Sequence, residues 1–171
     1  PAEAIIQSLE VISLPSIAQS IVTKKHTTYD EISNGVNLPK GDDVQSTVNL
    51  PFNFEFDGFI YNKIQVSTNG WLEFGIGSDG TERGLSTADQ IGNIGANENG
   101  RMASKARPSK ALGPCGEDLN TDLSGTTGQM SYKTLGSSPD RVFVMQWENM
   151  RAYYSEATTT RVNFQVRLYE T

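Results

Sequence analysis

The sequence is poor in cysteine and histidine, with one residue of each, and this scarcity excludes several kinds of chemistry. A single cysteine, Cys115, cannot form an internal disulfide bond, so the sequence predicts no disulfide framework. A catalytic thiol would need a nearby base, and the only histidine, His26, lies far from Cys115 in the sequence. Since no other arrangement typical of a catalytic nucleophile is present, we expect a protein that is not an enzyme.

Positive charge is also scarce. The sequence has 14 lysines and arginines against 20 aspartates and glutamates, which gives a formal net charge of −6. A nucleic-acid partner is therefore not expected, since binding to phosphates requires a basic face. Long apolar runs are missing as well, and none approaches the roughly 18 residues of a membrane span. The sequence begins with Pro1 rather than methionine, which is typical of a processed chain.

What the sequence does contain is a series of strand patterns separated by turns. Between residues 48 and 56 every second residue is apolar, a period of two that predicts a strand with one buried face. The dipeptides Asp57-Gly58 and Asn69-Gly70 stand between apolar runs, as in the tight turns of antiparallel hairpins. Further strands are predicted at three places, namely 129–134, 141–150 and 161–169.

The remaining segments set the expected architecture. The run at 141–150 is almost continuously apolar, which predicts a central strand covered on both faces, and a short strand is expected around 29–32. Residues 76–128 are rich in Gly, Ser, Asn and Asp and show little apolar periodicity, as is usual for an irregular segment. We therefore expect an all-β fold, an antiparallel two-sheet β-sandwich that is jelly-roll-like and carries a long irregular Gly-rich insertion.

The chain is expected to divide into a leader and one domain. Residues 1–25 are apolar and rich in β-branched side chains, which favour one or two strands there. Such a leader is open to exchange with a neighbouring molecule. Residues 26–171 are long enough for a single β-sandwich domain with a substantial core.

Three stretches of the sequence, 38–75, 116–150 and 162–171, carry a resemblance to a known kind of module. They combine a strand–NGW–strand meander with a PDR–strand–QW element, in family order over roughly residues 27–171. In this they resemble a β-sandwich module of secreted and surface proteins of Bacteroidetes bacteria, often found in chains with a C-terminal type IX secretion sorting domain. The module is also distantly similar to the NIDO domain of extracellular-matrix proteins. The resemblance implies an extracellular or outer-cell-surface location and brings no catalytic residues with it.

The sequence departs from the family pattern in two places. Family members usually carry a Trp-Asp-Asp-Leu type segment where this chain has residues 115–119, so the local packing is expected to differ there. The family pattern also continues past the LYET segment with another turn and strand, whereas this sequence stops at Thr171. The missing edge is expected either to be truncated or to come from another molecule.

Two motifs with catalytic or cofactor associations are better explained as loops. Gly75 to Gly80 fit the dinucleotide fingerprint G-x-G-x-x-G, but the amphipathic helix that must receive the pyrophosphate does not follow. We therefore expect no organic cofactor. The acidic pairs Asp42-Asp43 and Glu117-Asp118 could serve a glycosidase only if two carboxyls faced each other across a sugar, so surface turns are the preferred interpretation.

A calcium site is the one metal site that the sequence suggests. Asp118, Asn120 and Asp122 alternate along the chain, a spacing that can direct several oxygens at one Ca²⁺. The EF-hand pattern is absent, because Leu123 stands where that loop requires glycine. A solvated turn with Asx hydrogen bonds explains the same residues, so a structural Ca²⁺ stays an alternative.

The candidate ligand-contact residues belong to predicted loops. Tyr153 and Tyr154 offer flat amphipathic faces that suit stacking on sugar rings or contact with proteins. Arg101, Lys105 and Arg107 form a basic run that suits an acidic polysaccharide or another anionic partner, although such runs are more often solvated loops.

Taken together, these features predict a non-catalytic extracellular domain that acts in adhesion or surface architecture, with a cell-surface protein or glycan as its partner. Two alternatives stay open. One is a carbohydrate-binding module of a secreted enzyme, and the other is a subunit of a surface assembly that self-associates through its sheet edges and is completed by strand exchange.

Overall fold

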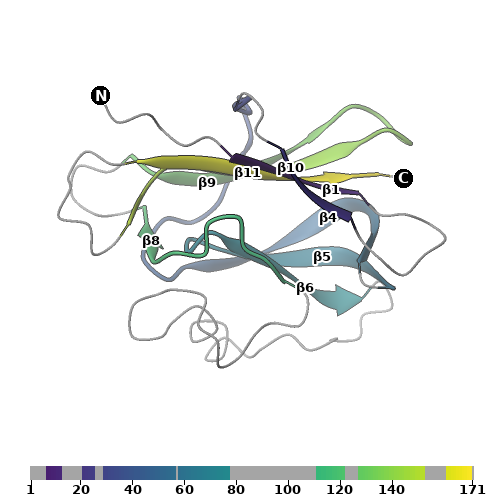
Figure 1. Ribbon diagram of the computed structural model, residues 1–171, viewed down its shortest axis with the longest axis horizontal. Coiled ribbons are helices and arrows are strands. Elements are labelled where there is room, and N and C mark those ends of the chain that lie inside the picture. Colours follow the sequence, from purple (N-terminus) through teal and green to yellow (C-terminus); the bar gives the residue numbers. More distant parts are fainter. Residues whose placement is uncertain are drawn as a thin grey trace.

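The structure, a computed structural model, consists of β-strands, and its described residues contain no helix. The described residues are 7–12, 21–25, 29–56, 58–77, 111–121, 127–152 and 161–170, and for 7–12, 21–25 and 75–77 only the backbone is described. Two sheets lie face to face, one of seven strands and one of four (Figure 1). The predicted all-β, two-sheet sandwich is therefore confirmed. Within these ranges nothing forms a helix long and apolar enough to cross a membrane.

The seven-stranded sheet brings together strands from both halves of the chain. Its order is β2-β1-β11-β10-β9-β3, and β8 pairs with β10 beside this path. The strands are β1 (Gln7–Ile12), β2 (Ile21–Lys25), β3 (Val36–Asn37), β8 (Leu119–Asn120), β9 (Gln129–Leu135), β10 (Val142–Ala152) and β11 (Val162–Tyr169). The two strands expected in the leader are thus present as β1 and β2.

The four-stranded sheet is the meander that the sequence predicted. Its order is β4-β5-β6-β7, and all its pairings are antiparallel. The strands are β4 (Gln45–Phe56), β5 (Phe59–Ser67), β6 (Trp71–Gly77) and β7 (Ala111–Leu112). The β4–β5 turn at Gly58 and the β5–β6 turn at Gly70 both place glycine at φ 74°, a conformation that other residues rarely adopt.

Two short strands lie in the stretch that was expected to be irregular. β7 extends the four-stranded sheet by pairing with β6, and β8 pairs with Arg151 and Ala152 at the end of β10. Residues 78–110 and 122–126 of the same stretch lie outside the described residues.

The hydrophobic core fills the space between the two sheets. The alternation in β4 is as predicted, with Val48, Leu50, Phe52 and Phe54 buried in the core. From the opposite sheet Trp147 stacks on Phe164 with 4.9 Å between ring centroids. The Trp147 indole N–H donates to the Ser67 carbonyl at 2.8 Å, which ties β10 to β5 across the core. Both tryptophans are buried, as the strand patterns predicted.

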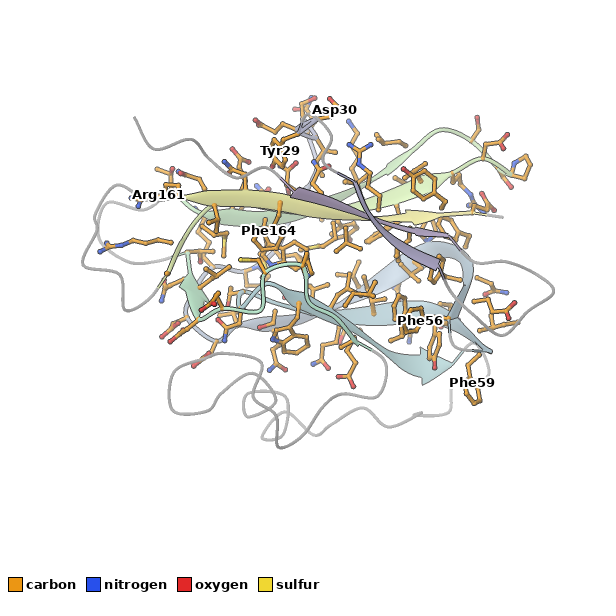
Figure 2. All side chains as sticks on the ribbon, in the orientation of Figure 1. Tyr29, Asp30, Phe56, Phe59, Arg161 and Phe164 are labelled. Atoms are coloured by element: carbon orange, nitrogen blue, oxygen red, sulfur yellow. The ribbon has the colours of Figure 1, made fainter. Side chains whose placement is uncertain are left out.

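The central strand β10 is covered on both faces, as its continuous apolar run predicted. The face turned away from the core is crossed by residues 29–35, and Tyr29 and Asp30 lie above the sheet in Figure 2. The prediction of a strand at 29–32 is wrong, because side chains satisfy the backbone of this segment. The Ile32 N–H donates to Gln146 at 2.9 Å, and the Gln165 amide donates to the Asp30 carbonyl at 2.8 Å.

Candidate functional site

Three carboxylates meet at the end of the sandwich where β8 lies (Figure 1). Asp42 and Asp43 belong to the connection between β3 and β4, and Asp118 directly precedes β8. Carboxylate oxygens of the three side chains lie within 4.8 Å of one another. Asp42 and Asp43 are exposed, whereas Asp118 is half-buried. We call these three residues the acidic cluster.

Backbone pairing holds the two acidic segments together. The Gly41 N–H donates to the Thr121 hydroxyl oxygen at 2.6 Å, and the Thr121 N–H donates to the Gly41 carbonyl at 3.2 Å. Between these contacts Asp42 and Asn120 form an isolated antiparallel bridge. These bonds fix the two backbone segments relative to each other. The fold itself therefore brings the segment that contains Asp42 close to Asp118.

The turn between β5 and β6 supplies a third anchor, Asn69. Its amide group donates to the Asp43 carboxylate at 2.7 Å, and its amide oxygen accepts a hydrogen bond from the Leu119 N–H at 3.0 Å. Asn69 is buried, with 4% of its surface exposed. The sequence marks Asn69 only as a turn residue, because a contact with Leu119, 50 positions away, leaves no local signal.

Burial and mutual repulsion shift the ionisation of the acidic cluster. The pKa of Asp118 rises to about 6, because burial disfavours its charged form and because Asp42, Asp43 and Glu117 are negatively charged neighbours. The pKa of Asp42 is also raised, first by partial desolvation and then by the charge of Asp43, and a hydrogen bond from the Asn120 side chain partly offsets this rise. The fully ionised cluster is therefore electrostatically unfavourable.

The geometry of the acidic cluster makes it a candidate cation site. Calcium binds oxygens at about 2.3–2.6 Å, so ligands on opposite sides of the ion are about 5 Å apart. The 4.8 Å spread of the three carboxylates fits within this span. The ion pairs that join one described residue to another link Arg141 to Glu170 and Arg167 to Asp30, and neither includes a member of the cluster. Three carboxylates with water could complete the coordination of a hard divalent cation.

The structure joins a different set of residues from the one that the alternating pattern suggested. Asp118 does belong to the acidic cluster, whereas Asn120 is buried and hydrogen-bonds to the Asp42 carboxylate. Asp122 lies outside the described residues. Asp42 and Asp43, interpreted from the sequence as a surface turn pair, are exposed in the connection between β3 and β4 and also lie beside Asp118. The only sequence signal that could have indicated them as site residues is the occurrence of two adjacent aspartates within a turn.

The predicted ligand-contact residues belong to segments outside the described part of the chain. These residues are Tyr153, Tyr154, Arg101, Lys105 and Arg107. Their role therefore stays a prediction.

Apolar side chains are exposed at the tip of the β4–β5 hairpin. Phe59 is 40% exposed and Ile60 46%, and Phe59 points away from the body of the sandwich (Figure 2). Phe56, on the other side of the turn, stacks on Phe74 with 4.6 Å between ring centroids and so anchors the tip. β5 runs from this tip to Ser67, next to the turn that contacts the acidic cluster. The apolar tip and the acidic cluster thus lie at opposite ends of the sandwich.

Two further titratable groups, Cys115 and Glu73, are half-buried and buried respectively. Cys115 packs against the core, and burial together with Glu117 raises the pKa of its thiol, which keeps the thiol protonated and weakly nucleophilic at neutral pH. Glu73 in β6 is 1% exposed, and burial raises its pKa to about 7. Since Leu72 and Phe74 belong to the core, alternation places Glu73 on the outer face of the four-stranded sheet. One of its carboxylate oxygens has no hydrogen-bond partner.

Comparison with known proteins places the chain in a family. No curated protein and no solved structure shows a significant match to it. A protein-family model described as NIDO related matches residues 21–171. This match includes every described strand from β2 to β11, and with them the acidic cluster and the hairpin tip. The resemblance to a NIDO-like module is therefore confirmed, and the chain belongs to the NIDO-related family.

Proposed function

We propose that this domain is a non-catalytic module of a secreted or cell-surface protein and that it acts in adhesion or surface architecture. Its membership of the NIDO-related family supports a module of this kind. The observation that carries the adhesive role is the exposed apolar pair Phe59 and Ile60 at the tip of a hairpin. Interfaces draw most of their binding energy from a few large apolar or aromatic side chains.

Strand pairing and ring stacking hold the residues on either side of the β4–β5 turn. β4 and β5 remain paired up to the Phe56–Phe59 position, directly at the turn. The stacking of Phe56 on Phe74 fixes the base of the tip to the core. Large apolar side chains gain binding energy when an apolar pocket removes them from water, so such a pocket on a cell-surface protein is the partner proposed for Phe59 and Ile60.

The proposal is tested by the binding of labelled domain to intact cells, to protease-treated cells and to a glycan array. The double variant Phe59→Ser/Ile60→Ser should bind intact cells at least about tenfold more weakly, which corresponds to about 1.4 kcal/mol. Val36→Ser is the matched control, because Val36 is also exposed and apolar but lies on β3. Its binding should stay within about twofold of the original, since scattered surface residues contribute little.

The same experiment separates the alternatives. Binding that survives protease treatment and reappears on the glycan array would favour the carbohydrate-binding module, in which Tyr153 and Tyr154 are the first residues to replace. Hydrolysis of a polysaccharide that disappears in Asp118→Asn or Glu117→Gln would contradict the non-catalytic role. Equal binding by the double variant and the original domain would contradict the role of the hairpin tip.

We also propose that a structural Ca²⁺ occupies the acidic cluster and rigidifies the adjoining loops. The support is the convergence of three carboxylates whose charges oppose one another, together with the Asn69 bridge that joins the surrounding segments. Extracellular modules commonly bind Ca²⁺ weakly, with dissociation constants of about 10⁻⁴–10⁻³ M.

The location outside the cell belongs to this proposal, as does the finer resemblance to Bacteroidetes proteins exported by type IX secretion. A full-length precursor with a signal peptide and a C-terminal sorting domain would support both. A precursor that joins this module to a catalytic domain would favour the carbohydrate-binding alternative.

A further inference from the structure

The edge of β11 is occupied by the N-terminal hairpin. β1 pairs with β11 in parallel, and β2 pairs with β1 in the antiparallel sense and stands at the end of the strand order. The other pairings among the described strands are antiparallel. A parallel partner cannot be joined to its neighbour by a tight turn, so the chain connectivity does not by itself place β1 here.

The register of β1 on β11 matches the chemistry of the two strands. Residues 7–11 lie opposite residues 164–168. In this backbone register the two apolar residues of β1 lie opposite apolar residues and its acid lies opposite a base, in the pairs Leu9 with Val166, Val11 with Leu168, and Glu10 with Arg167. A slip by one residue would place Glu10 opposite a buried core position of β11, so the sequence specifies this register.

We propose that β1 is an exchangeable strand and that the β11 edge can receive the β1–β2 hairpin of a second copy of the chain. β1 pairs with β11 on one side and with β2 on the other. Release of the β1–β2 hairpin therefore breaks one row of backbone hydrogen bonds, the row between β1 and β11. The core residues that the structure describes lie between Val48 and Leu168, outside the hairpin. Every copy of the chain carries the same complementary sequence, so the bonds lost within one molecule are regained between two.

Concentration decides between the closed and the exchanged form. A tethered strand competes at an effective concentration of about 1 mM, so dilute molecules keep their own hairpin. Molecules crowded on a surface approach that concentration and exchange. Only this biological setting rests on the proposed surface role, because exchange is a property of the chain in solution. Failure of exchange would leave the adhesive role of the hairpin tip untouched.

The test uses full-length chains in which Cys115→Ala removes the native thiol. One chain carries Glu10→Cys and the other, on a heavier tag, carries Arg167→Cys. The two are unfolded together, refolded at about 10 μM or about 1 mM and oxidised, so that one concentration lies far below the effective concentration of the tether and the other about equals it. Exchange predicts a disulfide-linked heterodimer that is at least about fivefold more abundant at the higher concentration. Asp140→Cys, in the exposed turn before β10, replaces Arg167→Cys as the control for random collisions.

Two further measurements make the result decisive. A single chain with both Glu10→Cys and Arg167→Cys should form an internal disulfide at low concentration, and its failure to do so would overturn the β1–β11 register. The unmodified chain refolded at high concentration should give a dimer by light scattering, which Leu9→Pro should abolish because proline removes a backbone donor. Heterodimer no more abundant than in the Asp140→Cys control, with the internal disulfide intact, would overturn exchange.

Discussion

At the scale of single residues, the buried carboxylate of Glu73 makes stability depend on pH. Its pKa is about 7 in the folded domain against an ordinary value of 4.5, and the cause is burial. Between these two pH values the unfolded chain has released the proton while the folded domain still holds it. The free energy of unfolding should therefore fall as pH rises from 4.5 to about 7 and stay low above that.

Replacing Glu73 by glutamine should remove this pH dependence, because the amide keeps the shape and has no charge to bury. At about pH 8 the variant should be more stable than the original by on the order of 3 kcal/mol, the equivalent of the pKa shift. At about pH 4 the two should be alike. Urea unfolding across this range measures the effect, with Glu55→Gln in the same sheet as the control. Equal pH profiles for Glu73→Gln and the original would contradict it.

Asp118 should also make the stability of the domain fall as pH rises, and bound Ca²⁺ should offset this loss. Its raised pKa means that the domain without metal loses stability as pH rises from 3.8 through about 6. With dissociation constants of about 10⁻⁴–10⁻³ M, 10 mM Ca²⁺ should add about 1.4–2.7 kcal/mol, or several degrees of melting temperature. Asp118→Asn should melt higher than the original in EDTA and lose the response to Ca²⁺. Asp140→Asn should respond normally, and an unresponsive original domain would exclude the site.

At the scale of structural elements, the two hairpin turns provide a matched pair of glycines. Gly58 and Gly70 share a φ of 74°, but an added Cβ meets nothing within 4 Å at Gly58 and lies 2.0 Å from the Cys115 carbonyl oxygen at Gly70. Gly58→Ala should cost about 1–2 kcal/mol from backbone strain alone. Gly70→Ala should cost more than about 3 kcal/mol, because the segment around Cys115 must move. Thermal unfolding of both variants gives the comparison, and equal costs would contradict it.

Local sequence patterns predicted the strands that pair with their neighbours along the chain. They failed for segments whose backbone is hydrogen-bonded by side chains far away in the sequence. The alternation at 48–56 and the two turn dipeptides are local properties, and they predicted β4 to β6 correctly. Residues 29–32 were misassigned because their backbone bonds to Gln146 and Gln165, more than 100 positions away. The acidic cluster was missed for the same reason, since the hydrogen bonds that hold its two segments together join Gly41 to Thr121, 80 positions away. Nothing local to β1 or β11 indicated their parallel pairing.

At the scale of the whole molecule, polar side chains join the two sheets in addition to the core. Arg141, directly before β10, donates to the Pro51 carbonyl of β4 at 2.7 Å and lies over the Phe52 ring, 5.5 Å from its centroid. The same guanidinium forms a two-point contact with Glu170, from Nε at 2.6 Å and from Nη2 at 2.5 Å. One side chain therefore connects β10, β4 and the residue after β11, and geometry of this kind makes an arginine pair more effective than an ordinary surface ion pair.

The contribution of the Arg141–Glu170 contact to the stability of the domain should increase with pH, whereas the effect of Glu73 lowers stability as pH rises. The hydrogen bond from Arg141 lowers the pKa of Glu170 to about 2 from 4.5, so its stabilising effect is complete above 4.5 and is lost as pH falls towards 2. Glu170→Gln should lower the melting temperature by roughly a few degrees at about pH 6 and by almost nothing at about pH 2. Asp30→Asn is the matched control, because Asp30 is 83% exposed and lies 3.8 Å from Arg167, where an ion pair contributes little. A deficit for Glu170→Gln that is the same at both pH values would mean that the glutamate acts through packing rather than through its charge.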